Sequence, residues 1–492
     1  MLETDVLVAG AGPAGLLLAA ELALAGVRTT IVERHPSRPP YCRGFTLNSR
    51  SLDLLARRGL AEGLIAEGHR VPHAPVTGLP GPLPLTDAAT DHPFSLGIPQ
   101  TRVEEVLERW AADLGVEILR GHELRSFTQS PESVSSVVHN GQFGRTVSAR
   151  FLVGCDGGRS TVRKQAGIGF PGVDARWYAL LGDVECELPY GVSTGPDGRT
   201  VFAIPRPGYV RIVVHEDDPP ADKYAPVPLE RLQAQVDAVL GQHVELREPR
   251  WLTRFGDAAR LAAHYREGRV LLAGDAAHIH PPAGAIGVNV ALDDAFNLGW
   301  KLAATVHGTA PEGLLDTYHA ERHAAGARIL ANTQAQVALE EAGDAPWADL
   351  MRRIAAHPAG NRALAEIITG LDACYEPGGH PWLGRLAPDV PLVVSSTETH
   401  LAALLHPGRP VLLDLTGSFA AWSAAVEVVT ASSPSTSDID AVLLRPDGHV
   451  AWVGTPGSGD DGLAEAVHRW IGDAGPPALP LGGVPESSLS AG

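Results

Sequence analysis

The feature that most constrains the fold lies near the start of the chain, where a glycine-rich turn joins an apolar strand-like run to an apolar helix-like run. The turn reads Gly10-Ala11-Gly12-Pro13-Ala14-Gly15, between the runs 6–9 and 13–25. In such a turn the first glycine permits the tight bend, the second lets the backbone approach a pyrophosphate, and the third lets the helix pack on the strand. Gly26 is placed to end the helix, and 27–32 follows as a second strand. The pattern predicts a βαβ unit with parallel strands.

Glu33 ends the second predicted strand, roughly 20 positions after the glycines. A carboxylate there can accept hydrogen bonds from both hydroxyls of an adenosine ribose. The phosphates would meet free amides at the positive end of the helix. The glycines alone do not separate FAD from NAD. The predicted dinucleotide site consists of Gly10, Gly12, Pro13, Ala14, Gly15, Glu33 and Arg34.

The composition narrows the possible functions. The 492 residues are enough for two or three domains. Lysine and arginine number 39 against 57 aspartates and glutamates, and the net charge of −18 argues against binding to nucleic acid or to an anionic membrane surface. The four cysteines form no CxxC pair, so neither a zinc site nor a redox dithiol is predicted. We expect a soluble cytoplasmic protein without a metal.

The apolar run 6–27 could be mistaken for a signal peptide or a membrane span. The preceding segment 1–5 is acidic, whereas a signal peptide needs a basic start. Gly10, Gly12, Pro13 and Gly15 interrupt the run, as expected of a turn between strand and helix. We therefore predict that the chain has no membrane partner.

Two later stretches also run from an apolar strand into a turn. Residues 151–163 read Phe-Leu-Val-Gly-Cys-Asp-Gly-Gly-Arg-Ser-Thr-Val-Arg, and residues 269–282 read Arg-Val-Leu-Leu-Ala-Gly-Asp-Ala-Ala-His-Ile-His-Pro-Pro. With the first glycine turn, they resemble the motifs of class A flavoprotein monooxygenases, the para-hydroxybenzoate hydroxylase superfamily. The resemblance implies that FAD is the cofactor, and that Asp156 and Gly157 support both FAD and the nicotinamide cofactor.

The stretch 269–282 is implied to hold the flavin. Asp275 matches an aspartate that binds the ribityl chain of FAD, and Pro282 matches a wall beside the isoalloxazine ring. The helix after Asn289 would aim its positive end at the flavin pyrimidine. His278 and His280 are spaced like metal ligands, but no partner for them is evident, so we interpret them as motif residues. The implied cofactor contacts here are Gly274, Asp275, Pro282, Gly284, Gly287, Val288 and Asn289.

Over about residues 3–475 the chain is similar to one subgroup, the aromatic-polyketide hydroxylases of antibiotic pathways and the rifampicin monooxygenases. By this resemblance Arg43 and Gln100 are implied to contact FAD. Arg211 matches an arginine that can face the flavin, where it could hold a substrate oxygen or guide flavin movement. A solvated strand arginine is the plainer alternative. Arg211 and Pro282 are the candidate catalytic residues at the flavin face.

One departure from the family concerns the turn that follows Pro282. The family commonly has Gly-Gly-Gln-Gly before the asparagine, whereas this chain has Gly284-Ala285-Ile286-Gly287-Val288-Asn289. Ala285 adds a methyl group where the backbone comes close, and Ile286 replaces an amide with a hydrocarbon. We expect the change to affect flavin mobility, oxygen access or protection of the reactive intermediate.

The fold implied by the resemblance is α/β, with a GR2-type Rossmann-like FAD-binding domain, an antiparallel-sheet substrate domain and a C-terminal thioredoxin-like domain. Helices are predicted at 229–240, 293–308 and 312–340, and C-terminal strands at 411–414 and 441–444. The lack of a CxxC pair excludes thiol redox chemistry in the last domain. The expected borders are 1–72, 98–175 and 266–390 for the FAD-binding domain, 73–97 and 176–265 for the substrate domain, 391–475 for the C-terminal domain and 476–492 for a mobile tail.

The resemblance implies a monooxygenase, monomeric or homodimeric, that consumes NAD(P)H and O₂. Transiently bound NAD(P)H reduces FAD, and a C4a-hydroperoxyflavin then transfers one oxygen atom to a polycyclic aromatic substrate. FAD itself carries out the redox chemistry, so no catalytic triad of side chains is expected. Two alternatives remain: a Baeyer–Villiger or epoxidising oxygenase on the same scaffold, and a redox-neutral flavoprotein without oxygen transfer.

Overall fold

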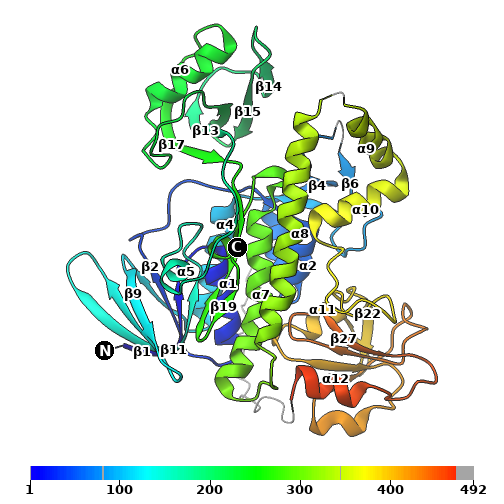
Figure 1. Cartoon of the computed structure of the whole chain (residues 1–492). Coiled ribbons are helices and arrows are strands. Elements are labelled where there is room, and N and C mark those ends of the chain that lie inside the picture. The colour runs from blue at the N-terminus through cyan, green and yellow to red at the C-terminus, as the bar shows by residue number, and fades with distance from the viewer. Residues whose placement is uncertain (1, 80–81, 344, 473–492) are drawn as a thin grey trace, which may run out of the picture.

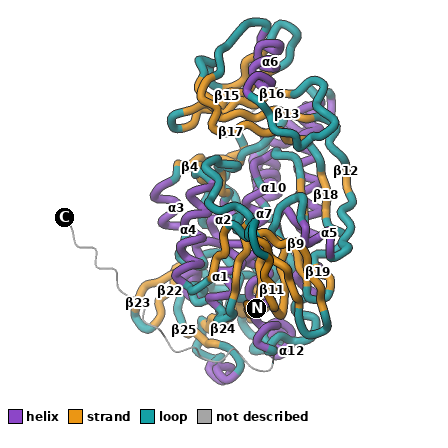
Figure 2. Tube along the Cα trace, turned by 90° about the vertical axis from the view of Figure 1, so that its left-hand side faces the viewer, coloured by secondary structure: helices purple, strands orange, loops and turns teal. Residues whose placement is uncertain are grey.

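The computed structural model describes residues 2–79, 82–343 and 345–472. Three larger sheets organise these residues into a central body, a body built on an antiparallel sheet, and a C-terminal body. Figure 1 shows the antiparallel-sheet body above the central one and the C-terminal body at its lower right, and Figure 2 shows the same arrangement from the side. The protein therefore has a mixed α/β fold. The tail predicted at 476–492 lies outside the described residues.

The central body is built on an eight-stranded sheet whose middle strands are parallel. In spatial order these are β20 (Val270–Leu272), β11 (Gly144–Gly154), β1 (Leu2–Ala9), β2 (Thr29–Glu33) and β8 (Glu117–Arg120). The antiparallel additions are β19 (Arg266–Glu267), β9 (Glu123–Gln129) and β10 (Val134–His139). Val6, Leu7 and Val8 are fully buried, as a short apolar run in a parallel sheet should be. The predicted βαβ unit is confirmed.

The helix α1 (Pro13–Leu24) connects β1 to β2 and is apolar on almost every side. It packs against α4 (Gln100–Asp113) and α7 (Gly287–His307), and it is buried from Ala14 to Leu22. Burial on several sides explains why its sequence has no polar face. Gly26 follows the helix with φ +79°, so the predicted helix end is confirmed.

The second body is a five-stranded antiparallel sheet. Its spatial order is β14 (Gly191–Thr194), β15 (Thr200–Arg206), β16 (Tyr209–His215), β13 (Tyr178–Glu185) and β17 (Arg247–Gly256). The helix α6 (Leu229–Leu240) packs on one face and shares a buried core with the sheet. The hairpins predicted from the Pro/Gly punctuation and the helix predicted at 229–240 are therefore confirmed.

Long helices complete the central body. The helix α7 begins at Gly287, before the predicted start at 293, and α8 (Asp316–Glu341) matches the second long prediction closely. The sequence analysis missed α9 (Pro346–Ala356) and α10 (Pro358–Thr369), although each has a proline in its first turn and Gly370 ends α10 with φ +75°. Within the described ranges, no helix combines the length and the apolar content that a membrane span requires.

Shorter elements complete the three bodies and the segments between them. They are α2 (Ser49–Ala56), α3 (Ala61–Glu67), α5 (Thr161–Gln165), α11 (Leu401–Leu404), β3 (Thr46–Leu47), β4 (His69–Val71), β5 (His73–Ala74), β6 (Leu83–Pro84), β7 (Ser95–Gly97), β12 (Gly172–Val173), β18 (Ala259–Leu261), β21 (His278–Ile279), β22 (Pro391–Val394) and β23 (Thr397–His400), with three short 3₁₀ helices at 274–276, 283–285 and 420–424.

The C-terminal body has a four-stranded sheet covered by one amphipathic helix. The spatial order is β25 (Glu427–Thr430), β24 (Val411–Asp414), β26 (Ala441–Leu444) and β27 (Val450–Gly454), and α12 (Leu463–Trp470) packs against β26 and β27. The first two strands pair in parallel and the other pairs are antiparallel. The strands predicted at 411–414 and 441–444 are confirmed.

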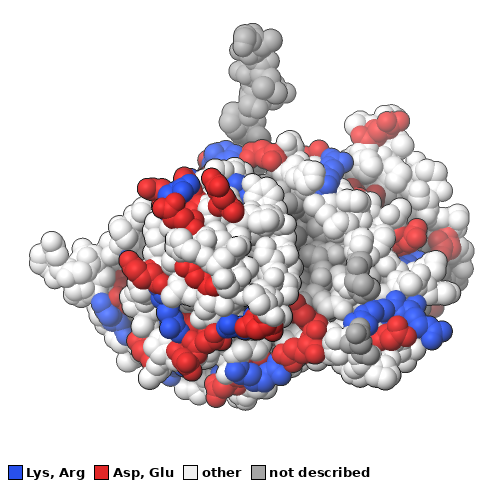
Figure 3. Space-filling model, turned by 90° about the horizontal axis from the view of Figure 1, so that it is seen from above, with Lys and Arg blue, Asp and Glu red and all other residues white. Residues whose placement is uncertain are grey.

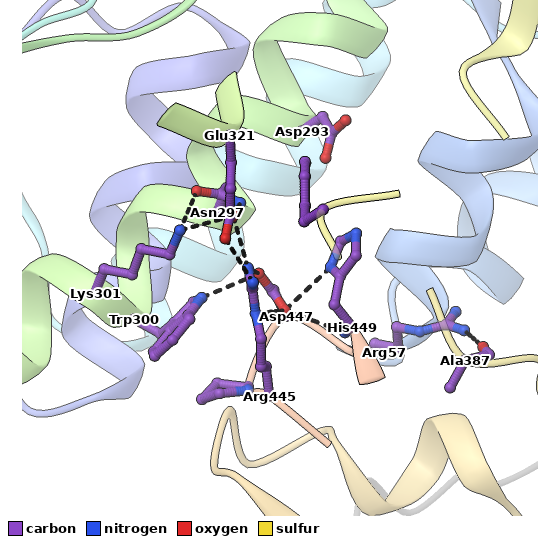
Figure 4. Close-up of polar contacts among 12 residues, drawn as sticks. Arg57, Asp293, Asn297, Trp300, Lys301, Glu321, Ala387, Arg445, Asp447 and His449 are labelled. Carbon is purple, nitrogen blue, oxygen red and sulfur yellow. Dashed lines mark hydrogen bonds and ion pairs between the residues drawn. The ribbon is translucent and has the colours of Figure 1, made fainter. Parts of the chain in front are cut away.

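A hairpin turn between β26 and β27, Arg445–His449, docks the C-terminal body on the helices α7 and α8. We call it the docking turn (Figure 4). Arg445 donates two hydrogen bonds to Glu321 of α8, at 2.8 and 3.0 Å, and Trp300 of α7 donates one to Asp447 at 3.1 Å. The Nζ of Lys301 lies 2.8 Å from Glu321. Because these groups are buried, each charge needs its partner.

This docking predicts a loss of stability in acid. Burial alone would raise the pKa of the Glu321 carboxyl, but Arg445 and Lys301 outweigh burial and lower the pKa to about 2. Arg322 and Arg50 likewise hold the pKa of buried Asp293 at about 2. In the unfolded chain both carboxyls take up protons at a higher pH, so their stabilisation is present above about pH 4.5 and is lost as the pH falls toward 2. Each contributes roughly 2–3 kcal/mol.

We expect the free energy of urea unfolding, followed by tryptophan fluorescence, to fall steeply below pH 4.5. Glu321→Gln removes one titrating group, so the variant should be less stable at pH 7 and should have a flatter profile in acid. Parallel profiles for the wild type and this variant would contradict the role of Glu321.

Candidate functional site

The glycine turn after β1 is packed so tightly that two of its positions exclude a side chain. A Cβ atom on Gly10, which has φ +108°, would lie 2.3 Å from the carbonyl oxygen of Cys155, and one on Gly15 would lie 2.0 Å from the carbonyl oxygen of Gly10. A Cβ on Gly12 would meet no protein atom within 4 Å. Gly12 therefore faces open space, which is where a pyrophosphate would approach the backbone.

The start of α1 offers its amides to an anion. Gly12 is the N-cap and has no side chain to bind the first N–H groups, and Pro13 occupies the first turn. Glu33, at the end of β2, accepts a hydrogen bond from the N–H of Ala11 at 2.9 Å and one from His35 at 2.8 Å. Each carboxylate oxygen keeps a second lone pair, which can accept from a ribose hydroxyl. Arg34 is exposed directly beside it.

The segment around Asp156 lies next to this turn, since the N–H of Cys155 donates to Ala9 at 2.8 Å. One oxygen of Asp156 caps α5 by accepting from Thr161 and Val162, at 2.7 and 3.1 Å. The other oxygen is buried and has no partner within the described part of the chain. Burial raises the pKa of this carboxyl in spite of its hydrogen bonds. Gly157 follows with φ +81°, where other residues would be strained.

The third motif meets the other two, although it lies more than a hundred residues away in sequence. A Cβ on Gly274, which has φ +62°, would lie 3.2 Å from Cβ of Ala14, so the two turns are in contact. Arg163, which follows the Asp156 turn, donates to the carbonyl of Ala276 at 2.8 Å. The three stretches therefore form one site at the carboxyl ends of β1, β11 and β20, where open α/β sheets bind their ligands.

Asp275 is exposed, and no described residue forms a hydrogen bond with its carboxylate. Its neighbours are fixed instead: Asp294 of α7 accepts from the N–H of Gly274 at 3.0 Å and lies 2.7 Å from Nε2 of His278. A free carboxylate on a fixed turn suits a flexible polyol. His278 is thus a partner of Asp294, and among the described residues no group of three or more His, Cys, Asp or Glu is placed to hold a metal.

The turn 281–289 carries the departure from the family pattern. Pro282 and Ala285 are exposed, whereas Ile286 is buried. Gly284 has φ +70°, and Ala285 has φ +51°, a left-handed conformation that costs a non-glycine residue about 1 kcal/mol or more. No side chain caps α7, so the amides near Gly287 and Val288 are available to an acceptor.

Asn289 holds this turn against the rest of the body. Its Oδ1 accepts from the N–H of Asn48 at 2.8 Å, and its Nδ2 donates to Thr46 and Ala285, each at 3.2 Å. Its side chain therefore fixes the turn, a role the sequence analysis did not foresee. The start of α7 has no side-chain cap, and its predicted contact with the flavin pyrimidine stays a prediction.

The remaining predicted contacts gather around the segment 42–44. Arg43 is exposed, and the N–H of Gln100 at the start of α4 donates to Gly44 at 2.8 Å. Arg211 is buried, with two hydrogen bonds to Asp183 at 2.7 and 2.8 Å. Its Nη1 and Nη2 also donate to the carbonyls of Arg43 and Cys42. Arg211 therefore contacts the protein's own backbone, and its predicted contact with flavin or substrate stays a prediction.

The sequence analysis gave no role to the residues that hold the motifs together. Asp293 and Asp294 are buried in the middle of α7, where Arg50 and Arg322 bind them. Two adjacent carboxylates inside a mostly apolar helix were a usable signal, because buried charges require partners.

The comparisons with known proteins agree with this geometry. The family described as FAD binding domain matches residues 3–333, and the family described as aromatic-ring hydroxylase, C-terminal, matches residues 380–474. The chain is 41% identical to 12-dehydrotetracycline 5-monooxygenase/anhydrotetracycline 6-monooxygenase of Streptomyces rimosus, over 96% of this chain and 99% of the relative. It is 42% identical to a rifampicin monooxygenase of Streptomyces venezuelae, with the same coverage of both chains.

Solved structures lead to the same family. Anhydrotetracycline hydroxylase from Streptomyces rimosus superposes with a TM-score of 0.91 at 40% identity, covering 96% of this chain and all of that one. Aklavinone-11 hydroxylase with FAD and aklavinone superposes with a TM-score of 0.74 at 26% identity, covering 96% of this chain and 99% of that one. The chain belongs to the family of FAD-binding aromatic-ring hydroxylases. It is an FAD-dependent monooxygenase, as the resemblance implied.

Removal of the Asp275 carboxylate should release the cofactor. We expect purified Asp275→Ala to be colourless or weakly yellow and to bind added FAD about 10- to 100-fold more weakly, because a hydrogen bond to a charged group is lost. Flavin absorbance and fluorescence titration of the apoprotein measure this. Asp349→Ala is the control, because Asp349 is also exposed and its carboxylate also forms no hydrogen bond within the described chain. Full flavin content in Asp275→Ala would refute the assignment.

The altered turn predicts unequal effects of restoring the family residues one at a time. In Ala285→Gly the relief of strain and the added freedom of the unfolded chain nearly cancel, so the free energy of unfolding should change by less than about 1 kcal/mol. Ile286→Gln buries an amide and should cost about 1–3 kcal/mol. Urea unfolding of the apoproteins measures both, and equal losses would contradict the burial assigned to Ile286.

Proposed function

We propose that this protein hydroxylates a polycyclic aromatic substrate of the polyketide type, using FAD, O₂ and transiently bound NAD(P)H. The observation that carries the proposal is the meeting of the Gly12, Asp156 and Asp275 turns at one end of the central sheet. Relatives with about 40% identity over nearly the whole chain act on anhydrotetracycline or rifampicin by their names.

In the proposed site FAD lies across the carboxyl ends of the central strands. Gly12 and the start of α1 hold the pyrophosphate, Glu33 and Arg34 lie at the adenosine ribose, and Asp275 holds the ribityl chain. Pro282 and the uncapped start of α7 line the ring, with Arg43 and Gln100 at its other side. The other predicted cofactor residues shape the backbone around FAD. They are Gly10, Pro13, Ala14, Gly15, Asp156, Gly157, Gly274, Gly284, Gly287, Val288 and Asn289. When bound, FAD supplies hydride acceptance and the activation of O₂.

The face of the five-stranded sheet opposite α6 is the proposed substrate platform. A row of side chains, Val192, Phe202, Val213, Leu181 and Thr253, crosses all five strands in register. Arg211 lies on the same face, two residues before Val213, and contacts the segment 42–43 of the central body. The platform therefore faces the predicted position of the flavin. A broad, largely apolar row suits fused aromatic rings.

In this proposal the substrate reaches the platform from the side of the molecule that Figure 3 shows. Figure 3 shows a groove on that side, between the antiparallel-sheet body and the neighbouring part of the molecule that carries α9 and α10. The row ends at Val192 and Phe202, which remain 66% and 43% exposed and so leave one edge of the platform open. A hydrophobic substrate that enters there would displace water from the reacting ring.

The expected domain borders stay part of the proposal: 1–72, 98–175 and 266–390, then 73–97 and 176–265, then 391–475. A GR2-type Rossmann-like first domain fits the strand order of the central sheet. A thioredoxin-like third domain is supported by the order β25-β24-β26-β27 with one parallel pair at its edge. That segment contains no cysteine, so it has no thiol chemistry. A cytoplasmic, monomeric or homodimeric protein without nucleic-acid partners remains our prediction.

A redox-neutral reaction is the second candidate, because a specific observation favours it. The chain is also 40% identical to a dialkyldecalin synthase of Streptomyces rugosporus, over 96% of this chain and all of the relative. The Ala285-Ile286 pair, which departs from the family pattern, is compatible with a flavin that does not transfer oxygen. A Baeyer–Villiger reaction on the same scaffold is the third candidate function.

Incubation of the holoprotein with NADPH, ¹⁸O₂ and a panel of polycyclic phenols, anhydrotetracycline and rifampicin separates these reactions. We expect one labelled hydroxyl oxygen in the product, because one atom of O₂ is transferred. Mass spectrometry locates the label, and Asp275→Ala serves as the inactive control. Turnover without label would support the redox-neutral reaction, and label in a new ester oxygen would support the Baeyer–Villiger reaction.

A further inference from the structure

The docking turn extends into the central body through His449. Its Nε2 lies 3.1 Å from Nη2 of Arg50 on α2. Arg50 in turn donates two hydrogen bonds to Asp293 on α7, at 2.9 and 3.2 Å. All three residues are buried, so solvent does not replace these contacts.

Arg322 of α8 joins the two neighbouring aspartates of α7. It donates to Asp293 at 2.7 Å and to Asp294 at 2.8 Å. Asp294 then holds the N–H of Gly274 and the ring of His278, the two residues that bracket Asp275. A series of polar contacts, none longer than 3.2 Å, therefore runs from the C-terminal body to the Asp275 turn.

Buried charges form two matched groups on either side of His449. Asp293 and Asp294 pair with Arg50 and Arg322 on the side of the Asp275 turn. Glu321 and Asp447 pair with Lys301 and Arg445 at the docking turn, which Figure 4 shows. Removal of a member leaves a buried charge unpaired within its own group, and His449 joins the two groups through Asp447 and Arg50.

We propose that the docking turn of the C-terminal body is a positioning element for the cofactor. Through His449 and Arg50 it fixes Asp293 and, by way of Arg322, Asp294, and Asp294 fixes the backbone on both sides of Asp275. The inference rests on the proposed placement of FAD against Asp275. It gives the C-terminal body a role in flavin binding that requires no redox group of its own.

The test is the FAD dissociation constant of the full-length apoprotein, measured by flavin fluorescence. His449→Phe interrupts the series within the C-terminal body, and Asp293→Asn interrupts it within α7. The side chain of neither residue forms a hydrogen bond with Gly274, Asp275 or His278. We expect each variant to bind FAD about 3- to 10-fold more weakly. In the double variant the two effects should not multiply, because both changes interrupt the same series.

Glu321→Gln is the matched control. Glu321 binds the same docking turn through Arg445, but within the described chain it forms no hydrogen bond with Asp293 or Asp294. This variant should lower the unfolding temperature at least as much as His449→Phe, yet keep the FAD dissociation constant within about twofold of the wild type. If His449→Phe does not fold, His449→Gln, which keeps a polar side chain, takes its place.

Unchanged FAD affinity in His449→Phe, with loss of FAD in Asp275→Ala, would overturn the inference and leave the proposed flavin site intact. An equal weakening by Glu321→Gln would also overturn it, because general stability would then explain the effect. Full FAD binding by Asp275→Ala would refute the proposed site, and the inference with it.

Discussion

The close approach of three backbone turns at one end of the central sheet is the constraint on which the rest of this structure depends. The first turn can touch the Cys155 carbonyl only because Gly10 has no side chain, and the third can touch Ala14 only because Gly274 has none. These contacts bring a free helix N-terminus, a free carboxylate and a second uncapped helix together at one end of the sheet. Such an arrangement fits a long molecule that has phosphates in its middle and an electron-accepting ring at one end.

Buried charge, rather than apolar packing alone, connects the site to the C-terminal body. Apolar surfaces tolerate small sliding movements, whereas a paired buried charge is held by short, directional bonds. Asp293 and Asp294 are central because one accepts from α2 and the other accepts from the flavin motif, while Arg322 binds both. The arrangement explains why charged residues occur in the interior of a long apolar helix.

Much of the fold could be predicted because local pattern and tertiary role coincide in it. The apolar run before Gly10 forms a buried strand, and the Pro/Gly punctuation around residue 200 forms hairpins, as predicted. The helices α9 and α10 were missed although they are about as long as the predicted α6 and each has a proline in its first turn. Arg211 shows the limit for side chains: its place on a sheet face followed from the sequence, but its use by Asp183 and by two backbone carbonyls did not.

The sequence by itself determined the kind of site, since glycines at fixed spacing, a strand-terminal Glu33 and the motif with Asp275 each have a local physical reason to be there. Only the tertiary structure decided which residues hold these motifs in place. Asn289 binds a strand residue, Thr46, that is more than two hundred residues away in sequence, and His449 reaches Arg50 across an even longer interval. The reason is that a hydrogen bond depends on distance and direction in space. The order of residues does not give either one, and both are set only when the chain folds.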